Sequence, residues 1–159
     1  MASHRLERVQ VVPGAVPDVS RFFEDPENLA RITPPWMRFR IASPRPIVMA
    51  VGARIDYTIR LGVLPVRWRT VITCYEPGVR FVDEQERGPY RRWRHVHEFE
   101  PVAGGTRVRD VVEYDVGFGP LGALVRRWYV APTLERIFDF RAHAVAALLG
   151  PGRPAEAAR

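Results

Sequence analysis

The feature that most constrains the fold is the run at residues 91–100, in which two chemical classes of side chain alternate. Every second position holds a ring: Trp93, His95, His97 and Phe99. The positions between them are charged, except for Val96. Successive side chains of a β-strand point to opposite faces, so the run predicts a strand with one solvated and one interior face. An interior face made of rings with a few polar groups is typical of a small-molecule cavity.

Alternating side chains and turn residues predict further strands along the chain. These strands cover residues 5–12, 37–42, 53–61, 66–75, 80–87 and 106–116. Short connections between them predict antiparallel neighbours joined as hairpins. In the segment 66–75 the alternation places Cys74 on the same face as Trp68 and Ile72.

Helices are predicted after the first strand and at the C-terminal end. Residues 17–23 form a short helix, and Asp-Pro-Glu at 25–27 supplies a capping residue, a first-turn proline and a favourable charge for a second one. The prolines at 34–35 must end that second helix by Thr33. From Pro120 a long helix is expected, with a kink at 130–133 because Pro132 lacks a backbone donor. Its apolar stripe would comprise Leu121, Leu124, Val125, Trp128, Leu134, Ile137, Phe138, Val145 and Leu148.

Length and composition indicate one domain at residues 1–150, followed by a disordered tail at 151–159 that is rich in Gly, Pro and Ala. The N-terminus lacks the apolar segment of a signal peptide, and no apolar run approaches the roughly 20 residues of an integral membrane helix. Cys74 is the only cysteine, which suits a reducing compartment. We therefore expect a cytoplasmic protein.

The positive charge of the chain does not predict a nucleic-acid partner. The net charge is +6, and all 24 basic residues are Arg. These arginines are scattered, and the densest group, at 87–94, lies close in sequence to Glu84, Glu86, Glu98 and Glu100. Cross-strand ion pairs on the outer sheet face are the expected arrangement. No specific nucleic-acid binding is expected.

The order of these elements favours an α+β fold, because a curved antiparallel sheet of seven strands can bury its interior face around the last helix. Several segments also resemble one superfamily: 22–29, 32–36, 81–85, 88–90, 93–99, 105–106 with Asp110 and Tyr114, and 117–122. They are similar to the START/polyketide-cyclase-like (SRPBCC) superfamily, in particular to its bacterial stand-alone cyclase/dehydrase-like members. The resemblance implies the helix-grip fold. That superfamily includes lipid carriers, hormone receptors, aromatases and cyclases, so fold alone leaves the activity open.

The two histidines of the strand at 91–100 allow three interpretations. His95 and His97 share one face, and Asp110 is expected to meet them from the next strand. They could be a buried hydrogen-bonded pair with Asp110 or Tyr114 as partner, because an unpaired buried polar group costs about 1–3 kcal/mol. They could instead act as acid and base in an aldol-type ring closure, with Asp110 assisting. A metal site is the third interpretation, but the ligand count is short, since Glu98 and Glu100 face outward. No metal or other cofactor is expected.

We predict that the protein binds a hydrophobic small molecule, lipid-, polyketide- or aromatic-like, between sheet and helix. The alternative is a polyketide cyclase or dehydratase that uses His95 and His97, and a third hypothesis is an interaction module with a filled core. Monomer and homodimer both remain open. The candidate ligand-binding residues are Trp36, Tyr57, Trp68, Phe81, Gln85, Trp93, His95, His97, Phe99, Asp110, Tyr114, Trp128 and Phe138.

Overall fold

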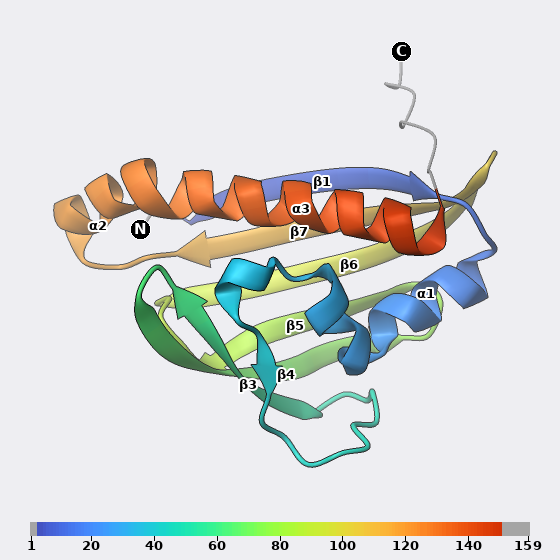
Figure 1. The fold of residues 1–159 in the computed structure, drawn as a ribbon, viewed down its shortest axis with the longest axis horizontal. Coiled ribbons are helices and arrows are strands. Elements are labelled where there is room, and N and C mark those ends of the chain that lie inside the picture. The colour runs from blue at the N-terminus through green and yellow to red at the C-terminus, as the bar shows by residue number, and fades with distance from the viewer. Residues whose placement is uncertain (1–2, 151–159) are drawn as a thin grey trace.

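The computed structural model describes residues 3–150, so the tail predicted at 151–159 lies outside the described residues. One antiparallel sheet has the strand order β1-β7-β6-β5-β4-β3-β2, and the C-terminal helix lies across one of its faces (Figure 1). This arrangement confirms the predicted seven-stranded helix-grip fold. The strands are β1 (His4–Val12), β2 (Arg40–Ile41), β3 (Arg54–Leu61), β4 (Leu64–Glu76), β5 (Arg80–Arg87), β6 (Arg92–Val102) and β7 (Gly105–Asp115).

Short helices connect β1 to β2 and cover one end of the sheet (Figure 1). They are α1 (Val16–Glu24), η1 (Pro26–Ile32) and η2 (Pro35–Met37). The carboxylate of Asp25 accepts a hydrogen bond of 2.9 Å from the backbone N–H of Glu27, as expected of a cap. The predicted second helix is present, but as a 3-10 helix that ends at Ile32 before the proline pair.

The C-terminal helix consists of α2 (Gly119–Val125), the π-helical turn η3 (Arg126–Val130) and α3 (Ala131–Leu149). Pro132 lies in the first turn of α3, and the irregular turn directly precedes it. A proline removes the hydrogen bond to the preceding turn, so the wider π turn accommodates that loss. The predicted interruption is therefore present, one turn earlier than expected. No helix within residues 3–150 is long and apolar enough to span a membrane.

The predicted strand at 37–42 is wrong for most of its length. Only Arg40–Ile41 pairs with β3, whereas Met37 ends η2 and Arg38 adopts a left-handed conformation with φ of 46°. Met37 is nevertheless buried against Ile59 and Trp68. The period-two pattern therefore described which side chains are buried, although the backbone there is a turn.

The predicted interior position of Cys74 is also wrong. The register between β4 and β5 shifts between Ile72 and Cys74. Such a β-bulge inserts an extra residue and reverses the alternation beyond it. As a result, Tyr75 packs against the interior cluster, and Cys74 packs on the outer face beside Val82 and Val96.

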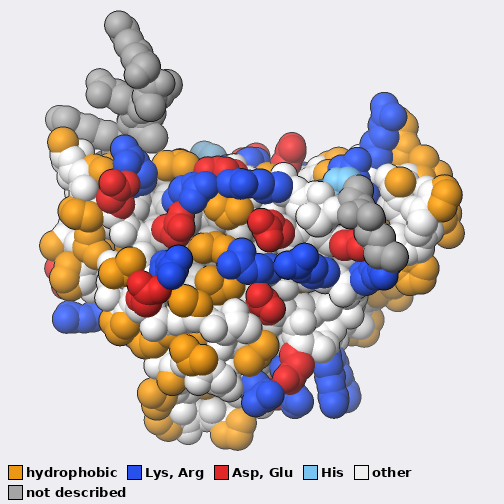
Figure 2. Space-filling view, turned by 180° about the vertical axis from the view of Figure 1, so that it is seen from behind, with side chains coloured by type: hydrophobic (Ala, Val, Ile, Leu, Met, Phe, Trp, Pro, Cys, Tyr) orange, Lys and Arg blue, Asp and Glu red, His pale blue; other side chains and the backbone are white. Residues whose placement is uncertain are grey.

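The outer face of the sheet carries the ion pairs that the sequence predicted, with partly different partners. Rows of basic and acidic side chains cross this face (Figure 2). Arg94 lies 3.4 Å from Glu84 and 3.7 Å from Glu113. Glu86, Glu98 and Glu100 pair with Arg54, Arg109 and Arg107 respectively. Arg87, Arg91 and Arg92 are thus not the partners of these acids. The sheet register instead places Arg109 and Arg107 of β7 opposite Glu98 and Glu100.

Only the middle of the predicted apolar stripe is buried, since Leu148 at its C-terminal end is exposed like the residues at its N-terminal end. Leu134, Phe138 and Val145 of α3 pack into the interior. The N-terminal part of the helix extends past the strands (Figure 1), so no sheet surface covers all of its apolar residues. Leu121, Leu124, Val125 and Trp128 are consequently exposed.

Candidate functional site

A cavity of about 720 Å³ separates the interior sheet face from the C-terminal helix. Aromatic rings form much of its wall. The rings of Tyr57 and Trp68, opposite one another on β3 and β4, stack with centroids 5.9 Å apart. Trp93 of β6 meets Trp68 edge to face at 5.3 Å, and Tyr90 packs at 4.9 Å from Trp93. These contacts hold the wall rigid while leaving the space beside it open.

Part of the predicted ligand-binding set lines this cavity. The residues that do so are Tyr57, Trp68, Phe81, Trp93, His95, His97 and Phe138. Six of them come from strands, where alternation aims every second side chain at the interior. Phe138 belongs to the helix that faces them. Their placement on the wall is a structural fact, whereas ligand contact by these residues stays a prediction.

Three predicted residues lie inside the protein but away from the cavity. Phe99 packs in the filled cluster at the other end of the sheet, and Tyr114 is buried among residues of α3 and β7. Asp110 lies behind the two histidines. A position on an interior face is therefore not sufficient for a place at the cavity, because elements packed on that face cover part of it.

Three others occupy surface or turn positions. The Gln85 amide donates to the backbone carbonyl of Tyr90 at 2.7 Å and accepts from its N–H at 3.1 Å, so it holds a turn. Trp36 is 49% exposed and meets Phe140 edge to face. Trp128, on the part of the helix beyond the sheet, is 71% exposed.

A buried polar cluster forms one part of the wall, and the sheet register explains it. His95 pairs with Asp83 across β5 and β6, and His97 pairs with Asp110 across β6 and β7. His97 Nε2 lies 2.9 Å from Asp83 Oδ2, and His97 Nδ1 lies 2.8 Å from Asp110 Oδ1. His95 Nε2 lies 3.0 Å from the same Asp110 oxygen, and His95 Nδ1 lies 3.7 Å from Asp83 Oδ2. Each carboxylate therefore faces both imidazoles.

The two imidazoles differ in the direction of their pKa shifts because their surroundings differ. Burial by itself would lower the pKa of His97, but the carboxylates of Asp110 and Asp83, 2.8 and 2.9 Å from its ring nitrogens, outweigh burial and raise that pKa. Burial and the neighbouring charge of His97 lower the pKa of His95. The ring centroids are 3.8 Å apart, so two adjacent positive charges would repel strongly. A positive charge on the pair is therefore more stable on His97 than on His95.

Both carboxylates remain ionised in the interior. Burial opposes this, but the hydrogen bond from His97 and the nearby charges of His95, His97 and Arg141 hold the pKa of Asp83 below its usual range. The pKa of Asp110 lies well below its usual range, since the charge of Arg141, the hydrogen bond to His95 and the close approach of His97 exceed the cost of burial. Arg141 and the histidine pair thus supply the positive charge that stabilises the two buried carboxylates.

Sequence reasoning missed two members of this cluster, Asp83 and Arg141. Both line the cavity. Asp83 follows Phe81 by two residues on β5, so strict alternation from a buried ring would have identified it. Arg141 follows Phe138 by three residues on α3, within the apolar stripe. Its guanidinium lies 3.9 Å from Asp110 and over the rings of Phe23 and Phe138 at 5.6 and 5.8 Å.

The same cluster includes the residues best suited to hold a metal ion. One ligand atom each of Asp83, His95 and His97 lies within 4.8 Å of the others. All three residues line the cavity. The arrangement can therefore bind a cation, transfer protons, or orient a polar group of a ligand.

Solved structures with the same fold come from several bacteria. The Zhui aromatase/cyclase of a Streptomyces species superposes with a TM-score of 0.74 at 13% identity, covering 93% of this chain and 94% of that one. Protein CV1439 of Chromobacterium violaceum gives 0.70 at 16% identity, covering 95% and 99%. A START superfamily protein of Mycobacterium smegmatis gives 0.66 at 13% identity, covering 91% and 99%. Identities this low show a shared fold.

Sequence comparison assigns the family. A search of curated proteins found no sequence relative of this chain. The family model described as polyketide cyclase/dehydrase and lipid transport matches residues 12–140, which include every strand from β2 to β7 and most of the C-terminal helix. The chain therefore belongs to the polyketide cyclase/dehydrase and lipid transport family.

Proposed function

We propose that the protein binds a hydrophobic small molecule, lipid-, polyketide- or aromatic-like, in the cavity between the sheet and the C-terminal helix. The observation that carries this proposal is the size and lining of the cavity. Its volume of about 720 Å³ falls in the range of roughly 300–1,000 Å³ typical of ligand pockets. A dry void of this size without a ligand would forfeit much packing energy.

The acidic, basic and imidazole side chains of the wall are gathered on one side. His95, His97, Asp83 and Arg141 lie together there, whereas Tyr57 and Trp68 belong to the aromatic wall of β3 and β4. An apolar ligand with one polar group would therefore bind in a single orientation. Its polar group would face the histidines, and its apolar body would lie along the rings.

The opening for such a ligand lies between the helix and the hairpin of β3 and β4. Leu121 and Val125 on the helix side and Leu64 on the hairpin line the cavity, and all three are exposed to solvent. Side chains that are both cavity-lining and exposed mark a mouth. We propose that the ligand enters there, and we retain the cytosol as the compartment expected for a chain with one cysteine.

Native mass spectrometry of the purified protein, followed by solvent extraction, tests this function directly. We expect a lipophilic adduct that is lost on denaturation, or uptake of an apolar fluorescent probe by the delipidated protein. The Ile137→Trp variant places a large ring in the cavity from α3 and should abolish probe uptake. Leu148→Trp, on the same helix outside the cavity, is the matched control. A clean mass together with no probe uptake by the native protein would refute the proposal.

A second candidate function is ring closure or dehydration of a polyketide-like substrate. It is favoured by two adjacent imidazoles on the cavity wall whose pKa values shift in opposite directions, raised for His97 and lowered for His95, because such a pair can supply an acid and a base at one place. The Zhui structure with the same fold is an aromatase/cyclase. Turnover of a poly-β-ketone by native protein, lost in His95→Gln and His97→Gln while ligand binding persists, would support it. Unchanged turnover in both variants would exclude these residues as acid and base.

A further inference from the structure

We propose that Asp83, His95 and His97 form a binding site for one divalent transition-metal ion, for which Zn²⁺ is the best match. The sequence alone predicted no metal, because beyond His95, His97 and Asp110 the acids nearby in sequence face outward and no further ligand was expected. The sheet register supplies that ligand by placing Asp83 directly opposite His95.

The spacing of the three candidate ligand atoms fits a tetrahedral ion. His97 Nε2 and His95 Nδ1 lie 2.9 and 3.7 Å from Asp83 Oδ2. All three atoms lie within 4.8 Å of one another. Ligands at about 2.0–2.1 Å from a tetrahedral Zn²⁺ are separated by roughly 3.3 Å. Small side-chain rotations would therefore bring these atoms onto one ion.

Asp110 orients His95 for a metal site and lies close to His97. It forms a hydrogen bond of 3.0 Å with His95 Nε2, so the lone pair of His95 Nδ1 points toward Asp83. His97 Nδ1 lies 2.8 Å from the same Asp110 oxygen without the geometry of a regular hydrogen bond, and a proton on this nitrogen would leave His97 Nε2 free to bind a metal beside Asp83. A carboxylate that holds the second nitrogen of a metal-binding histidine is a regular feature of zinc sites.

The position of the cluster leaves room for a further ligand. Asp83, His95 and His97 line the cavity, whereas Asp110 lies behind them. Three protein ligands and one open position on a pocket are the pattern of a Zn²⁺ site that accepts water or a ligand oxygen. The open position faces the space where an apolar ligand would bind.

The surrounding charges tolerate a cation. In the metal-free protein a proton lies between His97 Nε2 and Asp83 Oδ2, and a metal ion would take its place. The two negative charges of Asp83 and Asp110 offset most of the positive charge of the ion and of Arg141. His and carboxylate ligands suit Zn²⁺, Co²⁺ and their first-row neighbours better than Ca²⁺ or Mg²⁺.

Calorimetric titration of the EDTA-treated full chain with Zn²⁺ tests the site. We expect one ion per chain, with Co²⁺ giving the visible absorption of a four-coordinate ion. In proton NMR of the native protein, Zn²⁺ should shift the ring signals of His95 and His97 and leave those of His4 and His143 unchanged. This measurement needs no variant, so it holds even if substitutions unfold the protein.

Matched variants locate the ligands. Asp83→Asn and His97→Gln should remove stoichiometric binding, while Glu84→Gln on the outer face and His143→Gln on the helix surface should bind as the native chain does. Asp110→Asn should weaken binding by about 10- to 100-fold, because it only orients the ligands. Circular dichroism of each variant separates lost ligands from lost fold.

Two outcomes would overturn the inference. One is the absence of stoichiometric Zn²⁺ or Co²⁺ binding by the native chain, which would leave the cluster as a closed hydrogen-bond network. The other is binding that shifts His4 or His143 instead. Neither outcome affects the proposed function, since apolar-probe uptake is measured separately in the presence of EDTA.

Discussion

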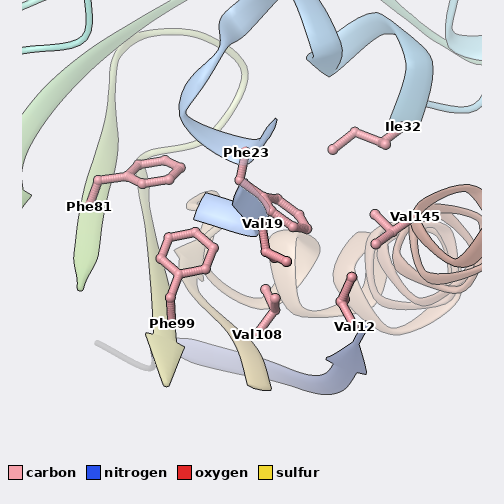
Figure 3. Packing of buried hydrophobic residues seen from close by; sticks show 8 residues of the cluster. All are labelled: Val12, Val19, Phe23, Ile32, Phe81, Phe99, Val108 and Val145. Atoms are coloured by element: carbon pink, nitrogen blue, oxygen red, sulfur yellow. The ribbon is translucent and has the colours of Figure 1, made fainter. Parts of the chain in front are cut away.

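The two ends of the interior sheet face share one helix and one sheet, yet one end is filled and the other is hollow. At the filled end, α1 and η1 close over the strands, and Phe23, Phe81 and Phe99 pack with Val12, Val19, Ile32, Val108 and Val145 (Figure 3). Phe23 and Phe81 form the border of this cluster and also line the cavity. At the hollow end, Tyr57, Trp68 and Trp93 surround the cavity. Aromatic rings occur at both ends, so residue type does not decide which end is filled. The covering elements decide it, because α1 and η1 insert their own side chains.

The largest expected effect is the loss of stability when a large side chain is shortened at the filled end, compared with the same kind of change at the cavity. Phe99→Ala should lower the free energy of unfolding by about 3–5 kcal/mol, because it leaves a void in a filled cluster. Leu61→Ala, on the cavity wall, should cost less than half as much, since that side chain already borders open space. Urea denaturation of both variants measures the difference. Equal losses would show that the cavity end is packed as tightly as the other.

The polar cluster between the two ends should respond to loss of one charge. Asp110→Asn removes the carboxylate that faces both histidines and Arg141. We expect a loss of about 3 kcal/mol, because a buried cation then lacks its partner. The same denaturation experiment applies, with Glu113→Gln on the outer face of β7 as control. If the two variants have equal stability, the buried network does not contribute to the fold.

Larger side chains should also have different effects on stability at the filled end and at the cavity. Val108→Phe should cost about 1–3 kcal/mol, because the filled cluster has no room for a ring. Ile59→Phe extends into the cavity and should change stability by less than about 1 kcal/mol, while it reduces uptake of an apolar probe. Thermal melting and probe titration are the measurements. A large loss in Ile59→Phe would contradict an open cavity.

The smallest effect is expected on the outer face. Arg94→Ala removes two ion pairs, to Glu84 and Glu113, whose side chains are all partly exposed. Exposed pairs contribute about 0–1 kcal/mol, and salt screens them. Denaturation at low and high salt should therefore show a small difference that shrinks further in high salt. A loss comparable to that of Phe99→Ala would mean that this face has a structural role of its own.

Much of the fold could be predicted from the sequence because alternation and helical spacing are local properties. The strand at Trp93 to Phe99 has its histidines on the interior face as predicted, and the C-terminal helix is interrupted near Pro132. The errors have local causes that alternation does not register. The left-handed backbone of Arg38 prevents the first residues of the predicted strand 37–42 from being extended. The β-bulge before Cys74 turns the residues after it to the opposite faces of the sheet.

The candidate site could be predicted only in part, since it depends on pairs of elements. His95 and His97 were found because they lie on one strand, and Asp110 was expected on the next. Asp83 and Arg141 were missed because their positions depend on contacts between elements. The register of β5 with β6 places Asp83 opposite His95, and the packing of α3 on the sheet brings Arg141 to Asp110. Trp36 and Trp128 were included in the candidate set, although neither lies on the cavity wall.

The sequence by itself determined the elements, the antiparallel neighbours and the faces of most strands, because each follows from contacts between residues near in the chain. It also contained the family relationship that residues 12–140 display. The tertiary structure alone decided that Asp83 and Arg141 join the histidines and that one end of the sheet is hollow. The size of the cavity depends on how far the helices lie from the strands, and that separation is set by which helices pack over which strands.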